Sequence, residues 1–302
     1  MSIRLNNNKP AAAGSKSSLG CCLIPVAVMV FAILAAILLG VLVVFFRAGG
    51  GPRGHAHVHA PATAPAYADP SSPPPAAVNP LQQALEPPDG VARKDGIGVA
   101  VLVDVSGSMN AGVPDADGHR RPKIAIARRS VLNLLGQCDK FARENPARNI
   151  QVGVYEFSSR DRELPCRVVI PIGPLDLDAA RAAVERMRPN GNTPIGDALI
   201  QAKMDLDLTG LTRLHVLVVT DGENNQGYAP TDVVNAMMAL PDEHRASVYF
   251  IAFDIAAERF NSVRDAGGLV LAASNETELQ QTLDYVLTGK ILAEQPQAVP
   301  GK

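Results

Sequence analysis

Cysteine is scarce in this chain of 302 residues, and no cysteine has the spacing of a zinc ligand. Cys21 and Cys22 begin an apolar run, whereas Cys138 and Cys166 lie far apart in the sequence. Zinc sites usually require closely spaced Cys or His pairs, so we expect no cysteine-based metal site. The second pair could form a disulfide in an oxidising compartment, and the sequence leaves this open because it does not give the distance between the two residues.

The chain also lacks a nucleotide-binding loop and an excess of basic residues in its larger part. No Gly-x-x-x-x-Gly-Lys-Ser/Thr pattern occurs, so any nucleotide chemistry would belong to a partner. Residues 69–302 carry 23 basic and 30 acidic residues, a formal charge of −7. Binding to nucleic acid requires a basic face. We therefore expect no nucleic-acid partner.

Acidic residues are absent from the first 68 positions, which contain five basic residues. Residues 1–20 are polar and are expected to form a disordered tail. Residues 21–46 carry no charge and are dominated by Leu, Ile, Val, Ala and Phe. About 20 such residues cross a bilayer as a helix, whereas the apolar part of a cleaved signal peptide spans about 7–15. The sequence therefore predicts one transmembrane helix at 21–46.

The basic residues near this segment indicate its orientation. Arg4, Lys9 and Lys16 precede it, and Arg47 and Arg53 follow it. The side with more basic residues tends to stay in the cytoplasm. This slight bias favours a cytoplasmic amino terminus and a single-pass membrane protein whose larger part is extracytoplasmic.

Residues 47–95 have the composition of a linker. Ten prolines occur between Pro52 and Pro88, among Ala, Ser and Gly, without a helical or strand period. Such a segment cannot bury a core and favours extended conformations, so we expect a flexible tether. Residues 291–302 are expected to form a loose carboxy-terminal tail, which leaves 96–290 as the folded domain.

Strand-like and helix-like segments alternate through residues 96–290. Gly98 to Val103 and Leu214 to Val219 are continuously apolar, as expected of strands that are buried on both faces. Between and after them lie helical patterns, for example 123–135, 195–204 and a last helix with the capping box Asn275 and Glu278. This alternation predicts an α/β fold, a doubly wound and mainly parallel sheet with helices on both faces.

Oxygen-bearing side chains follow two of the predicted strands. Asp104, Ser106 and Ser108 come directly after the first buried strand, and Asp221 follows the strand Leu214 to Val219. Thr193 lies in the loop before a predicted helix. The carboxyl ends of parallel strands lie on one edge of a sheet, so these five side chains can converge there. Carboxylate and hydroxyl oxygens suit a hard divalent cation such as Mg²⁺.

The pattern Asp104-x-Ser106-x-Ser108, followed by Thr193 and Asp221, resembles the metal-ion-dependent adhesion site of the von Willebrand factor type A (VWA) domain family. The resemblance covers about residues 96–290 and all five motif positions. It implies Mg²⁺, or Mn²⁺ or Ca²⁺, held directly or through water, with Thr193 joining directly when a ligand is bound and Asp221 often acting through water. It also implies that 168–172 form one antiparallel edge strand.

The same resemblance implies a function in binding. Largely neutral hydroxyl ligands leave the cation electrophilic, so an open coordination position can accept a carboxylate from a protein partner. We expect a membrane-tethered, metal-dependent adhesion or interaction module. The alternative is a scaffold or regulatory subunit of a membrane-associated assembly such as an ATPase or chelatase-like complex. An enzyme is not expected, because no histidine or other evident general base lies among the ligand turns.

Overall fold

The computed structural model describes residues 79–159 and 164–296. The predicted tail (1–20), the predicted transmembrane helix (21–46) and the linker up to residue 78 lie outside the described residues. Within the described ranges, no helix combines the length and the apolar character that crossing a membrane requires.

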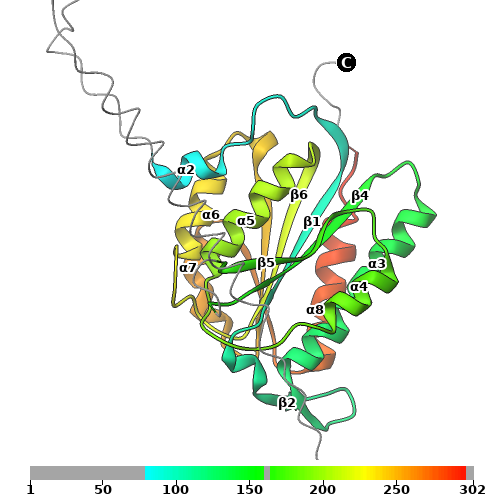
Figure 1. The fold of residues 1–302 in the computed structure, drawn as a ribbon, viewed down its shortest axis with the longest axis vertical. Helices are drawn as coiled ribbons and strands as arrows, with labels where there is room; N and C mark the ends of the chain where they lie inside the picture. Colours follow the sequence, from blue (N-terminus) through cyan, green and yellow to red (C-terminus); the bar gives the residue numbers. More distant parts are fainter. Residues whose placement is uncertain (1–78, 160–163, 297–302) are drawn as a thin grey trace, which may run out of the picture. The chain divides into compact units, whose positions relative to one another are not determined.

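Six strands form one sheet in the order β5-β4-β1-β6-β7-β8 (Figure 1). All neighbouring strands are parallel except β5, which pairs antiparallel with β4 at the edge. The mainly parallel sheet and its antiparallel edge strand are thus as predicted. The strands are β1 (Lys94–Asp104), β4 (Ile150–Phe157), β5 (Cys166–Gly173), β6 (Leu211–Thr220), β7 (Ala246–Phe253) and β8 (Leu269–Ala273).

Helices cover both faces of this sheet, which confirms the expected α/β class (Figure 1). One face carries α3 (Lys123–Glu144), α4 (Leu177–Val184) and α8 (Glu276–Val286), the last continued by a π-helical turn, Leu287–Ile291. The other face carries α2 (Pro80–Leu85), α5 (Ile195–Leu208), α6 (Pro230–Ala239) and α7 (Asn261–Asp265). Short 3-10 helices span Gly107–Asn110, Asp242–His244 and Ala257–Phe260.

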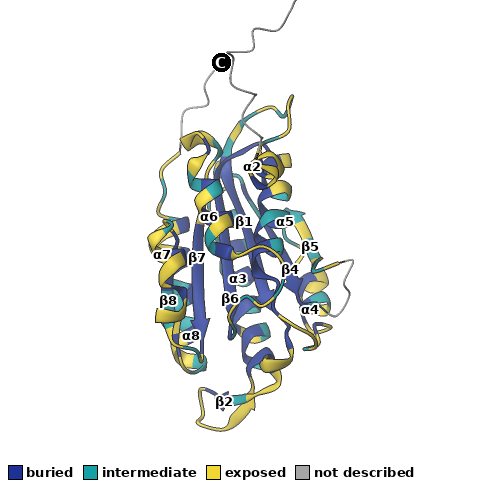
Figure 2. Cartoon of the chain, turned by 90° about the vertical axis from the view of Figure 1, so that its left-hand side faces the viewer, coloured by how far each residue is buried: buried dark blue, intermediate teal, exposed yellow. Residues whose placement is uncertain are grey.

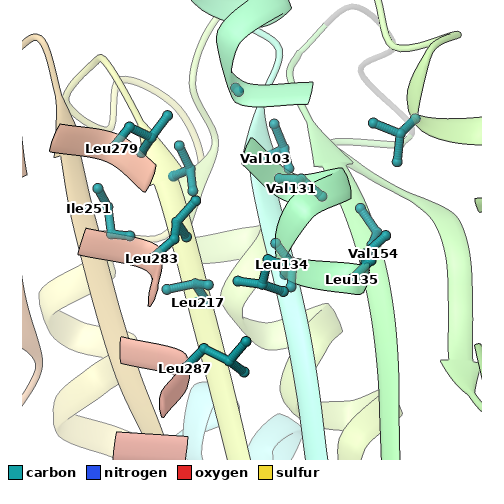
Figure 3. Packing of buried hydrophobic residues seen from close by; sticks show 14 of the residues in the cluster. Val103, Val131, Leu134, Leu135, Val154, Leu217, Ile251, Leu279, Leu283 and Leu287 are labelled. Atoms are coloured by element: carbon teal, nitrogen blue, oxygen red, sulfur yellow. The ribbon is translucent and has the colours of Figure 1, made fainter. Parts of the chain in front are cut away.

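Alternate residues of each strand point to opposite faces, so the sheet separates two hydrophobic clusters. On the first face, α3 and the last helical segment present residues spaced three or four apart to the strands (Figure 3). The labelled members are Val103, Val131, Leu134, Leu135, Val154, Leu217, Ile251, Leu279, Leu283 and Leu287. In Figure 2 the central strands β1, β4, β6 and β7 are largely buried, while the outer sides of the helices are exposed.

The folded part begins earlier than the predicted boundary at residue 96. Helix α2 lies within the predicted linker 47–95, and its Leu81 and Leu85 are buried in the second cluster. Asn79 caps this helix by accepting a hydrogen bond from the Leu81 backbone N–H at 3.0 Å, and Pro80 occupies its first turn. The linker prediction was therefore wrong for these residues, because the proline-rich composition masked two leucines at helical spacing.

The carboxy-terminal tail was also predicted to begin too early. Ile291 is buried in the first cluster, and Arg148 Nη1 donates to the Leu292 carbonyl at 3.0 Å. Arg213 donates to the Glu294 carbonyl at 3.2 Å. Residues 291–294 therefore pack onto the domain, although the sequence predicted a loose tail from 291.

The structure answers the question of the disulfide. Cys138 and Cys166 are both free thiols. Cys138 lies on α3 in the first cluster, whereas Cys166 begins β5 and packs against the second cluster on the other face of the sheet. The sheet itself separates the two thiols.

Candidate metal centre

The site begins where β1 ends, at the edge of the sheet formed by the carboxyl ends of its parallel strands. Asp104 is the last residue of β1 and pairs in register with Phe157, the last residue of β4. The loop that follows is held by two backbone hydrogen bonds, from Val105 N–H to the Phe157 carbonyl and from Gly107 N–H to the Gly191 carbonyl, both 3.0 Å. These contacts fix the loop that carries Ser106 and Ser108.

Asp104 is a fully buried carboxylate whose hydrogen-bond partners Ser106 and Thr220 are neutral. Its Oδ1 accepts from the Ser106 backbone N–H, and its Oδ2 accepts from the Thr220 hydroxyl, both at 2.7 Å. Among the residues that the structure describes, no basic side chain forms an ion pair with it. Burial raises the pKa of Asp104 to about 6, against the lowering effect of the hydrogen bonds from Thr220 and Ser106. A buried anion without a cationic partner favours a bound cation.

A chain of hydroxyl groups links this carboxylate loop to the second carboxylate. Ser106 Oγ and Ser108 Oγ lie 2.9 Å apart, and the Ser108 hydroxyl donates to Asp221 Oδ1 at 2.7 Å. Ser106 and Asp221 are buried, whereas Ser108 is exposed. The cluster is therefore enclosed on the domain side and reaches solvent at Ser108.

Thr193 comes from the third loop and lies beside the same group. A Cβ built on Gly222 would lie 3.4 Å from Thr193 Oγ1 and 3.9 Å from Ser108 Oγ. Thr193 is itself buried. The structure thus brings all five predicted residues together, although they are spread over the sequence from Asp104 to Asp221 and come from three separate loops.

Two asparagines that the sequence patterns did not single out position Thr193 and the start of α5. Asn225 Oδ1 accepts from the Thr193 backbone N–H at 2.8 Å, and Asn224 Oδ1 accepts from Ile195 N–H at 2.8 Å. The N-cap residue of α5 is Pro194, which makes no side-chain cap, so the free N–H groups of that helix find a partner on another loop. A proline at this cap was the available signal that a distant residue must cap α5.

Three further residues at this edge were also missed. Thr220 holds Asp104, while Lys123 Nζ lies 3.0 Å from Asp221 Oδ2 and 2.8 Å from Asp254 Oδ2. Burial acts to lower the pKa of Lys123, but the hydrogen bonds and charges of Asp254 and Asp221 outweigh it, so the pKa is raised. Lys123 is the first residue of α3, where the positive end of the helix dipole disfavours a cation. A lysine at the start of a predicted helix was therefore a feature of the sequence that indicated acidic partners.

A second group of acidic side chains, on the β2–β3 hairpin, stabilises a turn. Asp115, Asp117 and His119 offer ligand atoms within 4.8 Å of one another on the segment between β2 (Gly112–Pro114) and β3 (Arg120–Pro122). Asp115 Oδ1 already accepts from the backbone N–H groups of Asp117 at 3.0 Å and His119 at 2.8 Å. This hairpin extends beyond the carboxyl edge of the sheet, in a segment that the sequence left without a strand (Figures 1 and 2).

The five converging side chains have the chemistry of a site for a hard cation. They supply two carboxylates and three hydroxyls, and oxygen donors of this kind suit Mg²⁺ or Mn²⁺. Asp104, Ser106 and Ser108 could reach an ion from one loop, and Thr193 and Asp221 from the other two. The donor set and the buried, unpaired charge of Asp104 both fit such an ion.

The replacement Asp104→Asn tests the buried charge without any metal. Burial raises the pKa of Asp104 from 3.8 to about 6, so the folded protein retains a proton between these values that the unfolded chain releases. The contribution of Asp104 to stability therefore falls as the pH rises through this interval. From about pH 4 to about pH 7, the stability difference should shift in favour of Asp104→Asn by about 2 kcal/mol. Urea unfolding of both proteins in chelator measures this shift, and a pH-independent difference would contradict it.

Comparison with known proteins agrees with this architecture. Residues 99–223 match the family model described as the von Willebrand factor type A domain. The PilB minor pilin from Streptococcus sanguinis superposes with a TM-score of 0.50 at 16% identity, over 68% of this chain and 62% of that chain. This chain therefore covers less than two thirds of the pilin's length. None of the curated proteins compared with it matches.

Two further solved structures match this chain with lower TM-scores. A von Willebrand factor type A protein from Catenulispora acidiphila has 21% identity and a TM-score of 0.49, over 67% of this chain and 44% of that chain. BatB from Bacteroides thetaiotaomicron has 19% identity and a TM-score of 0.49, over 64% of this chain and 98% of that chain. Over residues 99–223, the family match, the sheet order and the convergence of the motif residues all indicate a von Willebrand factor type A domain.

Proposed function

We propose that this protein is a membrane-tethered module that binds a protein partner through a divalent metal ion. The observation that carries the proposal is the convergence of Asp104, Ser106, Ser108, Thr193 and Asp221 around a buried carboxylate with no basic partner among the described residues. VWA domains are associated with protein interaction and adhesion, and the converging oxygen donors give this domain the means for it.

Each of the five side chains has a distinct part in this proposal. Asp104 supplies the buried negative charge, and Ser106 and Ser108 supply neutral oxygens from the same loop. Thr193 and Asp221 close the site from the neighbouring loops. A bound Mg²⁺ would act as the electrophilic centre that accepts a carboxylate oxygen of the partner. Because three of the five donors are neutral, the charge of the ion is not fully offset by the protein.

Binding rather than catalysis is the proposed role of this site. Among the described residues, no histidine forms a hydrogen bond or an ion pair with any of the five side chains. A hydrolase would need a general base within hydrogen-bond reach of an attacking water. Lys123, the strongly basic residue that contacts Asp221, is already engaged by two carboxylates.

The membrane part of the proposal rests on the sequence. Residues 21–46 carry no charge over a length sufficient for a bilayer, and proline-rich residues follow. With the amino terminus in the cytoplasm, the VWA domain would be extracytoplasmic and tethered at some distance from the bilayer. Such an arrangement suits a domain that must reach a partner.

Replacing Asp104 with Ala should abolish Mg²⁺ binding by the purified, metal-free protein. The change removes the buried carboxylate while Ser106 and Ser108 remain, and we expect affinity to fall by at least about 100-fold. Isothermal titration with Mg²⁺ and Mn²⁺ measures the loss. Asp242→Ala is the matched control, because Asp242 is an exposed carboxylate that precedes β7 at the opposite edge of the sheet. Equal binding by wild type and Asp104→Ala would remove the metal assignment.

Partner binding should depend on both the metal and the intact site. Immobilised wild-type protein is expected to retain a partner from membrane extracts in Mg²⁺ and to lose it in chelator, whereas Asp104→Ala retains none in either buffer. Quantitative mass spectrometry of the eluates measures this difference. Identical protein sets from the four samples would contradict the proposal. A retained ATPase would favour the scaffold or regulatory-subunit alternative over adhesion.

The proposed topology predicts that external protease reaches the domain. Protease added to intact cells should cleave within the proline-rich residues and release a fragment that contains the VWA domain. Immunoblotting with an antibody against the domain follows the release, and an intact cytoplasmic marker protein shows that the cells remained closed. Full protection of the domain until the membrane is permeabilised would reverse the orientation.

A further inference from the structure

Lys123 is a buried cation that joins two carboxylates at the edge of the sheet. It is 6% exposed, and its Nζ lies 3.0 Å from Asp221 Oδ2 and 2.8 Å from Asp254 Oδ2. Its backbone N–H donates to the Ala111 carbonyl at 2.9 Å, which ties the start of α3 to the end of the loop that carries Ser106 and Ser108. The ammonium group is thus held at a fixed position beside the proposed metal site.

Asp254 directly follows β7, and Asp221 directly follows the neighbouring strand β6. Among the described residues, Asp254 is the one non-glycine residue with a positive φ, 55°. This left-handed conformation is unfavourable for most residues and is best tolerated by Asn and Asp. A strained backbone position persists when its surroundings require it, and such positions concentrate at functional sites. Here the geometry brings the Asp254 carboxylate to Lys123.

The contacts of Asp221 show what Lys123 does to the site. Asp221 Oδ1 accepts from the Ser108 hydroxyl at 2.7 Å, and its Oδ2 accepts from Lys123. Both oxygens are therefore oriented, one toward the proposed ligand Ser108 and the other toward the ammonium group. Asp104 has no such partner among the described residues. The two carboxylates of the predicted ligand set are consequently unequal, and Asp104 carries the uncompensated charge.

The charges of the carboxylates and the lysine around the proposed metal site balance those of a divalent ion. Three carboxylates, Asp104, Asp221 and Asp254, and the ammonium of Lys123 together carry a net charge of −2. A divalent cation would make this group neutral. Without Lys123 the loaded group would be negative and would repel the carboxylate that the proposed function requires.

We propose that Lys123 sets the charge of the metal site, weakening the hold on the cation in exchange for stronger binding of an anionic partner. It does so through the ion pairs with Asp221 and Asp254. This inference rests on the proposed function. It makes Lys123, which lies outside the five-residue motif, a positioning residue that determines the specificity of the site. The partner group it favours is a carboxylate or another small anion.

Two replacements shift the charge in opposite directions. Lys123→Met keeps a long apolar chain but removes the positive charge, so metal binding should become tighter. Asp254→Asn removes a negative charge, keeps Lys123 and suits the left-handed backbone, so metal binding should become weaker. Each change in Mg²⁺ affinity should be about tenfold, as expected for one charge several ångströms from the ion at a protein surface. Isothermal titration of the full chain measures both, with Lys123→Arg as the charge-conserving control that stays within about threefold of wild type.

A second measurement separates this role from support of the fold. Acetate serves as the probe anion, and its binding to the Mn²⁺-loaded protein is followed by water-proton relaxation as it displaces water from the ion. Lys123→Met should bind acetate more weakly while binding Mn²⁺ more tightly. A lysine that merely supported the fold would weaken both on removal, because the loops that carry the ligands would lose their order.

The outcomes separate the two proposals. If wild-type protein binds no Mg²⁺, the proposed function fails and this inference fails with it. If wild type binds Mg²⁺ but Lys123→Met binds it equally or more weakly, this inference alone is overturned. Should Lys123→Met not fold, Asp254→Asn decides, since it retains the ammonium group: weaker Mg²⁺ binding supports the role of Lys123, and unchanged or tighter binding overturns it.

Discussion

The burial of one carboxylate, Asp104, is the constraint on which the site depends. Asp104 ends a strand that lies between β4 and β6 in the middle of the sheet, so its side chain cannot reach water. Removing a carboxylate from water is costly, and hydrogen bonds from the Ser106 backbone and the Thr220 hydroxyl offset part of that cost. The remaining imbalance is what a cation would relieve, which connects the fold directly to the proposed chemistry.

The parallel arrangement determines which other groups surround this carboxylate. Strands β1, β6 and β7 are neighbours, and an aspartate lies at or just beyond the carboxyl end of each: Asp104, Asp221 and Asp254. Three acids on one edge would repel one another if nothing compensated them. Lys123, at the start of α3, forms ion pairs with Asp221 and Asp254. The charge of Asp104 can then be balanced by a metal ion. Charge compensation is thus distributed over helix and sheet.

The loops that carry the neutral ligands are held by backbone contacts from distant segments. The Gly191 carbonyl accepts from Gly107 N–H, and the Asn225 side chain accepts from Thr193 N–H. Gly196 lies so close to Tyr228 that an added Cβ would be 2.0 Å from its carbonyl oxygen, so the start of α5 must be a glycine there. The three loops form one connected unit, in which a shift of any one loop would disturb the others.

Some of this arrangement followed from the sequence alone, because it depends on local patterns. Apolar runs and helical periods established the α/β class, and the spacing of Asp104, Ser106 and Ser108 after a buried strand marked the edge of the sheet where Thr193 and Asp221 also lie. The tertiary structure alone decided the pairing of Lys123 with Asp221 and Asp254, the capping of α5 by Asn224, and the packing of α2. These contacts join residues that are distant in sequence; Lys123 and Asp221, for example, are 98 positions apart. A local hydrophobic period does not encode which distant side chains meet.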